Sequence, residues 1–359
     1  MGDYEIRRYG TGDRDEFLSL YATVMGERKG TEWFDWKYGA NPYVDHVAMF
    51  VAVTDGTIVG ARPFVALPVR IDGERDVVLQ PADAIVHPDH RRRGLFTRMT
   101  EHAIERYAGD HPFFFNFPNH RSLPGNLDLG WRIVSERSAY YRIANPVRVV
   151  RARTDRTGVQ VASRIGAPIA RGYYGLRDLT ASTPPTAAIR TVTEPPAAAL
   201  AALYRRSVPA GIHAVRDEEF YRWRLDNPDW EYTTYVAEER GEPRAAIVTG
   251  TAVESSLRTT KLTDVVPLGT APKPLLETLI HRILQDRAET DLFVAPSQGI
   301  PASVLGTFGF HPDAAPPLSF VSTRTTHVVR SLADDRERTG TDLGRPDSWL
   351  MTFIERDTS

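Results

Sequence analysis

Cysteine is absent from this chain of 359 residues. Its absence excludes a disulfide framework, thiolate zinc sites and a cysteine nucleophile, and it leaves the compartment open. No apolar run approaches the roughly 18 residues of a membrane helix, and the first eight residues lack the apolar core of a signal peptide. We therefore expect a cytoplasmic protein that does not bind membranes.

Charge of one sign is also missing. The 44 Lys and Arg residues nearly balance the 46 Asp and Glu residues, for a net charge of -2, which argues against nucleic-acid binding through overall charge. No set of His, Asp and Glu has the spacing of metal ligands, so we expect no metal. Lysine itself is scarce. Its only positions are Lys29, Lys37, Lys261 and Lys273.

What the sequence does have is an ordinary globular composition, 42% hydrophobic and 25% charged, at a length typical of about two domains. It also repeats itself. Four short segments of the first half recur in the same order in the second half, at a nearly constant separation. The pairs are 34–42 with 221–228, 83–86 with 264–267, 115–119 with 293–297, and 129–131 with 308–310.

This repeat predicts an α/β (α+β) protein made of two tandem domains, each with a central mixed, mostly antiparallel sheet flanked by helices. We place the domains at 1–145 and 187–359, joined by a connecting helix and linker at 146–186. Asp55-Gly56 predicts a hairpin turn, and the apolar run 113–117 predicts a central strand. We further expect one strand over 77–86, paired strands around Ile133 and 140–143, and a last strand over 349–355 that closes the second sheet.

The most informative segment follows the strand that ends at Val86. A turn with Arg91, Arg92 and Arg93 leads into a helix that opens at Gly94. A helix start offers unpaired N–H groups and the positive end of the dipole, and glycine leaves room for a close phosphate. The segment predicts a pyrophosphate cradle. The alternative is a surface turn with solvated arginines.

A sequence motif supports the cradle. Val86, Pro88, Arg91 and Gly94 match the motif Val-x-Pro-x-x-Arg/Gln-x-x-Gly-x-Gly/Ala, in which the chain resembles the GNAT superfamily of acyl-CoA-dependent N-acyltransferases. Phe96 departs from the small last residue of the motif. The segment 129–131 resembles the family's Leu-Gly-Phe as well. The resemblance implies the GNAT fold in a tandem arrangement.

In the second copy the matching turn is 268–274, where prolines delete amide donors and no arginine cluster remains. We infer that this copy is degenerate and has lost the cofactor site. We expect it to close the substrate cleft and to mediate formation of a homo-oligomer.

The resemblance also implies how the cosubstrate acetyl-CoA is held. Backbone N–H groups of 92–97 would bind the pyrophosphate, and strand residues would pair with the pantetheine arm in a slot where two strands separate. Asparagines at the mouth of this slot would bind the pantetheine amides. The expected acetyl-CoA contacts are Ile85, Val86, Arg91, Arg92, Arg93, Gly94, Leu95, Phe96, Thr97, Asn119 and Asn126.

The usual catalytic pair of the family is not present. The position of its tyrosine acid is Asn126 and that of its glutamate base is Gln80, and neither side chain can exchange a proton. Asp83, in an otherwise apolar strand, is a substitute base, and Tyr140 or Tyr141 is a substitute acid. The alternative for Asp83 is a structural carboxylate, and that for the tyrosines is packing.

The sequence therefore predicts an N-acetyltransferase that moves an acetyl group from acetyl-CoA to a primary amine of a small molecule by direct transfer. Two alternatives stay open. One is a catalytically weak acyl-CoA-binding sensor or assembly module. The other is a Fem-type aminoacyl transferase, which predicts a basic groove for charged tRNA and no CoA turn.

Overall fold

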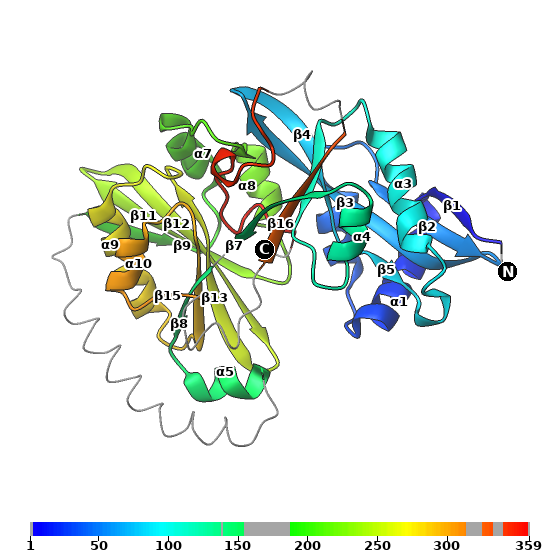
Figure 1. Cartoon of the computed structure of the whole chain (residues 1–359). Coiled ribbons are helices and arrows are strands. Elements are labelled where there is room, and N and C mark those ends of the chain that lie inside the picture. The colour runs from blue at the N-terminus through cyan, green and yellow to red at the C-terminus, as the bar shows by residue number, and fades with distance from the viewer. Residues whose placement is uncertain (1–2, 138, 154–186, 314–324, 333–339, 358–359) are drawn as a thin grey trace.

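The computed structural model describes residues 3–137, 139–153, 187–313, 325–332 and 340–357. Of the predicted connecting helix and linker over 146–186, residues 154–186 lie outside these ranges. Two sheets and the helices around them make up the described chain (Figure 1). Within the described ranges, none of the helices combines the length and the apolar character needed to span a bilayer.

The first sheet has the order β1-β2-β3-β4-β6-β16-β7, and the short strands β5 and β10 also pair with β3. It is antiparallel except between β4 and β6. Its strands are β1 (Glu5–Arg8), β2 (Met49–Thr54), β3 (Thr57–Ile71), β4 (Glu74–Pro81), β5 (Ile85–Val86), β6 (Phe113–Asn116), β7 (Arg132–Arg137), β10 (His213–Ala214) and β16 (Thr325–Ser331).

The second sheet has the order β15-β8-β14-β13-β12-β11-β9. Here β13 and β14 form the parallel pair. Its strands are β8 (Ala139–Ile143), β9 (Ala188–Val192), β11 (Glu231–Glu239), β12 (Glu242–Glu254), β13 (Leu257–Val266), β14 (Leu292–Pro296) and β15 (His311–Pro312).

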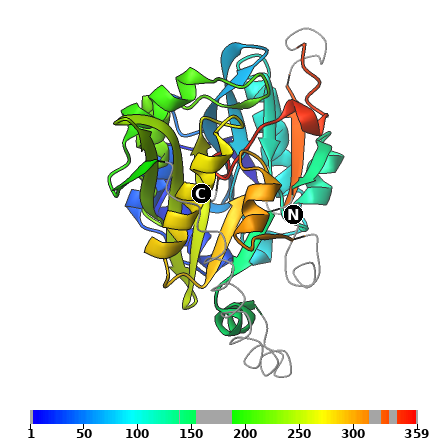
Figure 2. The ribbon, with the colours of Figure 1, turned by 90° about the vertical axis from the view of Figure 1, so that its left-hand side faces the viewer.

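The helices form layers on both sides of the sheets. α3 and α4 cover the outer face of the first sheet, α9 and α10 cover the outer face of the second (Figure 2), and α1, α2, α7 and α8 share one core between the sheets. The α-helices are α1 (Arg14–Met25), α2 (Thr31–Phe34), α3 (Leu95–Tyr107), α4 (Leu123–Asp128), α5 (Pro146–Arg153), α7 (Ala197–Arg206), α8 (Glu218–Arg224), α9 (Lys273–Asp286) and α10 (Ala302–Thr307). Shorter turns are the 3-10 helices η1 (Thr11–Asp13), η3 (Pro88–His90) and η5 (Pro346–Ser348) and the π-helix η2 (Asp35–Gly39).

Several sequence predictions are confirmed. Asp55 and Gly56 turn the hairpin between β2 and β3 with positive φ of 50° and 75°, which is the geometry of a two-residue hairpin turn. β6 is central, because it lies between β4 and β16 and all four of its residues are buried.

The predicted continuous strand over 77–86 is wrong. β4 ends at Pro81 and β5 begins at Ile85, and Asp83 between them has a positive φ of 36°. Both strands pair with β3, so the interruption acts as a bulge within one line of pairing. A bulge of this kind redirects a side chain, which the alternation of apolar residues does not reveal.

The predicted pairing of the strand at Ile133 with that at 140–143 is also wrong. β7 pairs with β16 of the second half, whereas β8 pairs with β14 and β15 in the second sheet. The chain passes from one sheet to the other between Arg137 and Ala139. The first half therefore contributes β8 to the second sheet, and the second half contributes β16 and the short β10 to the first.

The predicted last strand over 349–355 is not formed. Trp349 makes one isolated bridge with Ile212, and the amides of Phe353 and Ile354 then both donate to the Thr263 carbonyl at 3.1 Å. Trp349 and Ile354 belong to the core shared by the two sheets. Burial in that core, and not strand pairing, explains the apolar pattern of this segment.

The sequence repeat has a structural counterpart at the contact between the halves. The indole Nε1 of Trp36 donates to the Trp223 carbonyl at 2.8 Å, and the indole Nε1 of Trp223 donates to the Trp36 carbonyl at the same distance. These tryptophans are equivalent in the repeat. The contact is thus reciprocal, as expected when two copies of one fold pack about an approximate two-fold axis.

Candidate functional site

A groove of about 470 Å³ lies beside the start of α3. It is lined by the end of α1, the segment around β5, the arginine turn, the first turn of α3 and the segment that leads into α4. The lining residues are Val24, Met25, Ala84, Val86, His90, Arg91, Arg92, Gly94, Leu95, Phe96, Asn119, Arg121, Ser122 and Gly125.

The start of α3 gives the groove its hydrogen-bond donors. Gly94 is the N-cap residue, and no side chain caps the helix there. The first intrahelical bond runs from Arg98 to the Gly94 carbonyl at 3.0 Å, so the amides of 95–97 have no acceptor within the helix. Gly94 has a φ of 74° with open space where a Cβ would lie, a conformation that favours glycine.

The arginine turn is held in place by its own contacts. Arg91 Nε donates to the Val86 carbonyl at 3.1 Å, and Arg93 Nη2 donates to the Asp89 carbonyl at 3.3 Å. The Tyr4 hydroxyl and His90 Nδ1 lie 2.9 Å apart. These contacts fix the backbone of the turn before any ligand arrives, which lowers the entropic cost of binding.

Most of the predicted cosubstrate residues line this groove, namely Val86, Arg91, Arg92, Gly94, Leu95, Phe96 and Asn119. The side chains of Ile85, Arg93, Thr97 and Asn126 do not. Ile85 is buried in the core between the sheets, and Arg93 lies over the ring of Tyr4. Within the described ranges, no cluster of His, Asp and Glu is arranged to hold a metal ion.

Asn126 lies behind the groove rather than at its mouth. Its side chain is buried, its Nδ2 donates to the Ser122 carbonyl at 3.0 Å, and its Oδ1 accepts from Arg62 Nη2 at 3.2 Å. Both ends of the amide are therefore committed to the protein. Asn126 therefore does not contact the groove, and its role is to accept a hydrogen bond from Arg62 behind the groove wall.

Arg62, on β3, is the residue of this region that the sequence did not single out. Its guanidinium carbon lies 4.8 Å from the centre of the Phe96 ring and 5.6 Å from that of Phe64. Its Nε has no hydrogen-bond partner among the described residues. Burial lowers the pKa of Arg62 to about 9. The only signal in the sequence was an arginine in the middle of the apolar run of β3, which has its other arginine, Arg70, near its end.

At the bulge between β4 and β5, Asp83 forms a compact polar cluster. Its Oδ2 accepts from Lys37 Nζ and from the Tyr38 hydroxyl, both at 2.6 Å, and Lys37 Nζ lies 3.8 Å from Asp357 Oδ2. Burial, then the nearby Asp83 charge, raises the pKa of Tyr38 well above its usual value. Burial also raises the pKa of Asp357. Ala84, the residue after Asp83, lines the groove.

The second half also contains an aspartate that accepts a hydrogen bond from a tyrosine, in a more deeply buried position. Asp264, the counterpart of Asp83, accepts from the Tyr221 hydroxyl at 2.8 Å and from Arg216 Nη2 at 3.0 Å. Asp264 and Arg216 are completely buried, whereas Asp83 is only partly so. Each aspartate thus accepts from a tyrosine, although Tyr221 corresponds to Phe34 in the repeat and not to Tyr38, and access from solvent distinguishes the first half.

The structure does not bring the predicted tyrosine acids to the groove. Tyr140 and Tyr141 lie on β8, which the strand exchange places in the second sheet opposite Ala295 and Val294. Tyr140 packs against the core under α9 and α10. Tyr141 lines a different cavity.

The counterpart of the arginine turn in the second half is closed by the protein itself. Gly269 has a φ of 73°, and a Cβ placed there would lie 3.2 Å from Leu350 Cδ2. Pro272 is the N-cap residue of α9, and Pro274 occupies its first turn, so one amide donor of that turn is deleted. This turn thus offers less space at its glycine and one amide donor fewer than its counterpart.

Comparison with known proteins relates the part of the chain that holds this groove to one family model. Residues 5–134 match the family model of the GNAT acetyltransferase domain. No curated protein matches the sequence.

Solved structures with a similar fold include a GCN5-related N-acetyltransferase from Anabaena variabilis (TM-score 0.61, 11% identity) and a probable N-acyltransferase from Enterococcus faecalis (TM-score 0.64, 10% identity). Each comparison covers 92% of this chain and 73% of the other. Eis1 from Mycobacterium abscessus is similar at a TM-score of 0.53 and 14% identity, over 92% of this chain and 74% of its own. At these identities the likeness concerns the fold, and the similarity spans both halves.

Proposed function

We propose that this chain transfers an acetyl group from acetyl-CoA to a primary amine of a small molecule, because residues 5–134 match the GNAT acetyltransferase domain and the fold is similar to that of a solved GCN5-related N-acetyltransferase. The observation that carries the proposal is the groove at the start of α3. Helix amides with no acceptor inside the helix, three arginines (Arg91, Arg92 and Arg121) and a glycine with open space beside it meet there. This set of groups suits a pyrophosphate.

Each part of the groove has a role in holding acetyl-CoA. The amides of 95–97 bind the pyrophosphate, with Arg91 and Arg92 supplying charge. Val86 and Ala84 flank the pantetheine arm. β4 pairs with β6 at Leu79 and Phe114, whereas β5 pairs with β3. β5 and β6 therefore separate beyond the pair of Leu79 and Phe114, which supports the predicted slot between two strands.

Acetyl-CoA supplies the activated acyl group. The protein must remove a proton from the acceptor amine, because only the neutral amine attacks the acyl group. We assign proton removal to Asp83, which lies at the bulge next to the groove. Lys37 and Tyr38 fix its carboxylate by two short hydrogen bonds, and a base held in place in this way needs no reorganisation when the amine arrives. No covalent enzyme intermediate is required.

A positive charge, rather than a general acid, stabilises the departing thiolate. Gln80 is buried with its Nε2 donating to the Glu355 carbonyl at 3.1 Å, and Asn126 is bonded to Arg62. Neither amide exchanges a proton. The buried Arg62 guanidinium supplies positive charge behind the Phe96 wall, where a low dielectric strengthens its field.

Turnover with acetyl-CoA and a panel of small primary amines tests the proposal, with CoA release as the readout. Amine-dependent release of CoA is the expected result. Binding of acetyl-CoA without turnover of any amine would favour the sensor. Transfer from charged tRNA without binding of acetyl-CoA would favour a Fem-type enzyme.

A further inference from the structure

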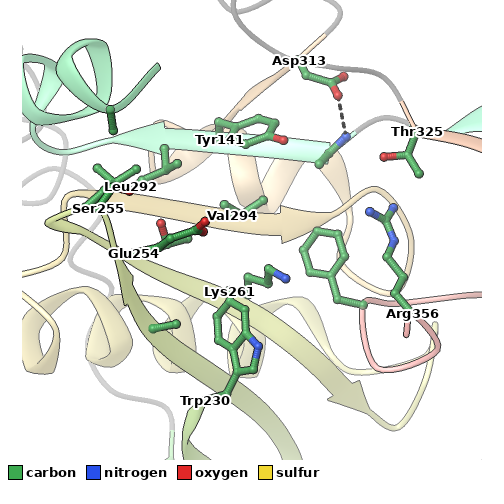
Figure 3. Close-up of a pocket in the computed structure, with 16 residues that line it drawn as sticks. Tyr141, Trp230, Glu254, Ser255, Lys261, Leu292, Val294, Asp313, Thr325 and Arg356 are labelled. Atoms are coloured by element: carbon green, nitrogen blue, oxygen red, sulfur yellow. Dashed lines mark hydrogen bonds between the residues drawn. The ribbon is translucent and has the colours of Figure 1, made fainter. Parts of the chain in front are cut away.

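A second cavity, of about 380 Å³, lies on one face of the second sheet (Figure 3). Leu292 and Val294 of β14 line it, while Phe293 and Ala295 between and after them pack under α9 and α10. Alternate residues of a strand point to opposite faces. The cavity therefore lies on the face away from α9 and α10, and no part of the acetyl-CoA groove belongs to it.

Much of the cavity wall is apolar and aromatic. Phe353 from the C-terminal segment packs with Leu292 and Val294 in one cluster. Trp230, which precedes β11, and Tyr141 on β8 contribute further rings. A wall of this composition suits a ligand with an aromatic or aliphatic body.

Two cations face this apolar space. Lys261 Nζ lies 4.2 Å from the centre of a Trp230 ring, and the Arg356 guanidinium carbon lies 4.8 Å from that of Phe353. Figure 3 shows Lys261 beside Trp230, with Arg356 at one end of the cavity. Burial, then the charges of Arg356 and Arg224, lowers the pKa of Lys261 to about 7, against the opposing effect of Asp357 and Glu254.

The carboxylates that oppose these basic groups include Glu254, Asp313 and Asp357. Glu254 is exposed at the hairpin end of β12, at the rim. Asp313 is bound to the backbone of β8, since its Oδ2 accepts from the Ala139 amide at 3.2 Å and its amide donates to the Ala139 carbonyl. Asp357 Oδ2 lies 3.8 Å from Lys37 Nζ, and Asp357 does not line the cavity. The end of the cavity between Lys261 and Arg356 is therefore its most basic part.

We propose that this cavity binds an organic carboxylate with an aromatic or apolar body. Its volume is within the range of small-molecule sites. The carboxylate accepts hydrogen bonds from Lys261 and Arg356, and the body packs against Trp230 and Phe353. An anion beside Lys261 favours its charged form, which burial and then the charges of Arg356 and Arg224 disfavour.

The site is connected to the candidate catalytic cluster through the chain. Arg356 faces the cavity, and the next residue, Asp357, lies 3.8 Å from Lys37, which binds Asp83. The carboxylate has two sources consistent with this arrangement. It belongs to the amine acceptor itself, or to a separate acid bound next to the catalytic site.

Calorimetric titration of the full chain with 3-phenylpropionate, in the absence of acetyl-CoA, tests the site. The neutral 3-phenylpropanamide is the matched ligand. We expect the carboxylate to bind more tightly than the amide. Lys261→Met should weaken carboxylate binding on the order of tenfold or more, the worth of a charge-assisted hydrogen bond. Lys273→Met, at the exposed start of α9, is the control and should leave binding unchanged.

Equal binding of acid and amide, failure of the acid to bind at millimolar concentration, or unchanged binding by a folded Lys261→Met protein would each overturn the proposal. These readouts need no turnover, so they stand apart from the proposed function. A second arm compares acetylation of 4-(aminomethyl)benzoate with that of benzylamine. A preference for the acid that is lost in Lys261→Met supports the acceptor as the source. Equal rates, with 3-phenylpropionate still bound, support a separate acid.

Discussion

Asp83 and Asp264 occupy equivalent places in the two halves, and each accepts a hydrogen bond from a tyrosine. We predict that Asp83→Asn lowers kcat by roughly 10²–10⁴-fold, because it removes the proton acceptor. The KM for acetyl-CoA should change little, since Asp83 does not line the groove. Steady-state kinetics, with thermal unfolding measured alongside, check this prediction.

Asp264→Asn is the matched control. Its carboxylate binds the fully buried Arg216, so we expect a loss of about 3 kcal/mol in the free energy of unfolding, measured by urea denaturation. The substitution should act on stability in the second half, where Asp83→Asn acts on turnover in the first. If Asp83→Asn instead destabilises the fold and leaves kcat of the remaining folded protein intact, Asp83 is structural.

Arg62 is expected to stabilise charge in the reaction at a cost to the fold. The folded protein lowers its pKa from 12.5 to about 9. Below pH 9 the group is charged in both states, so the burial penalty is present in full, and it fades as the pH rises above 9. We predict that Arg62→Met raises the free energy of unfolding by about 1–3 kcal/mol at pH 7 and lowers kcat.

Denaturant unfolding and steady-state kinetics on the same preparations measure both effects of Arg62→Met. Arg106→Met, at the exposed end of α3, serves as the control and should change neither. A variant that is less stable than the wild type but equally active would show that Arg62 serves packing alone.

The sequence predicts residues of this site only where they are neighbours in the chain. Arg91, Arg92 and Gly94 follow from one local motif, because a strand, a turn and a helix start position them together. Lys37 and Arg62 come from distant segments. Their roles depend on which strand has a bulge and which helix end lies above it. These features belong to the tertiary structure, and a local sequence pattern does not predict them.

At the level of elements, the exchange of β8 and β16 ties the two halves together. β16 lies between β6 and β7, so a fragment of residues 1–145 would expose two unpaired strand edges. We predict that this fragment is insoluble when expressed alone and is recovered when coexpressed with 187–359. Solubility and coelution in size-exclusion chromatography check this. A soluble, monomeric fragment that unfolds cooperatively would contradict it.

The strand exchange also marks the limit of prediction at this scale. Alternating apolar residues identify β7, β8 and β16 as strands, and a hairpin signal fixes β2 with β3. No local pattern states which sheet a strand joins, because the period of two is the same in both. The sequence does not predict the break between β4 and β5 for a similar reason, since a bulge preserves the apolar character of the run.

For the whole molecule, the repeat accounts for the fold and its divergence accounts for the site. The halves keep the reciprocal contact of Trp36 and Trp223 and a shared core. They differ in the turn before the helix, where the N-cap residue Gly94 borders open space, whereas Gly269, three residues before the N-cap Pro272 of α9, borders Leu350. One half thus retains the groove, and the other contributes the sheet face with the second cavity.

Calorimetric titration with acetyl-CoA tests the central claim most directly, using the wild type, Gly94→Glu and a control. Gly56→Glu is that control, because Gly56 has the same positive φ and open surroundings in a distant hairpin. We predict micromolar binding by the wild type and by Gly56→Glu, and none by Gly94→Glu. The glutamate side chain would fill the pyrophosphate site, and its carboxylate would repel the pyrophosphate. Absence of binding by the folded wild type, or equal binding by Gly94→Glu, would contradict the account.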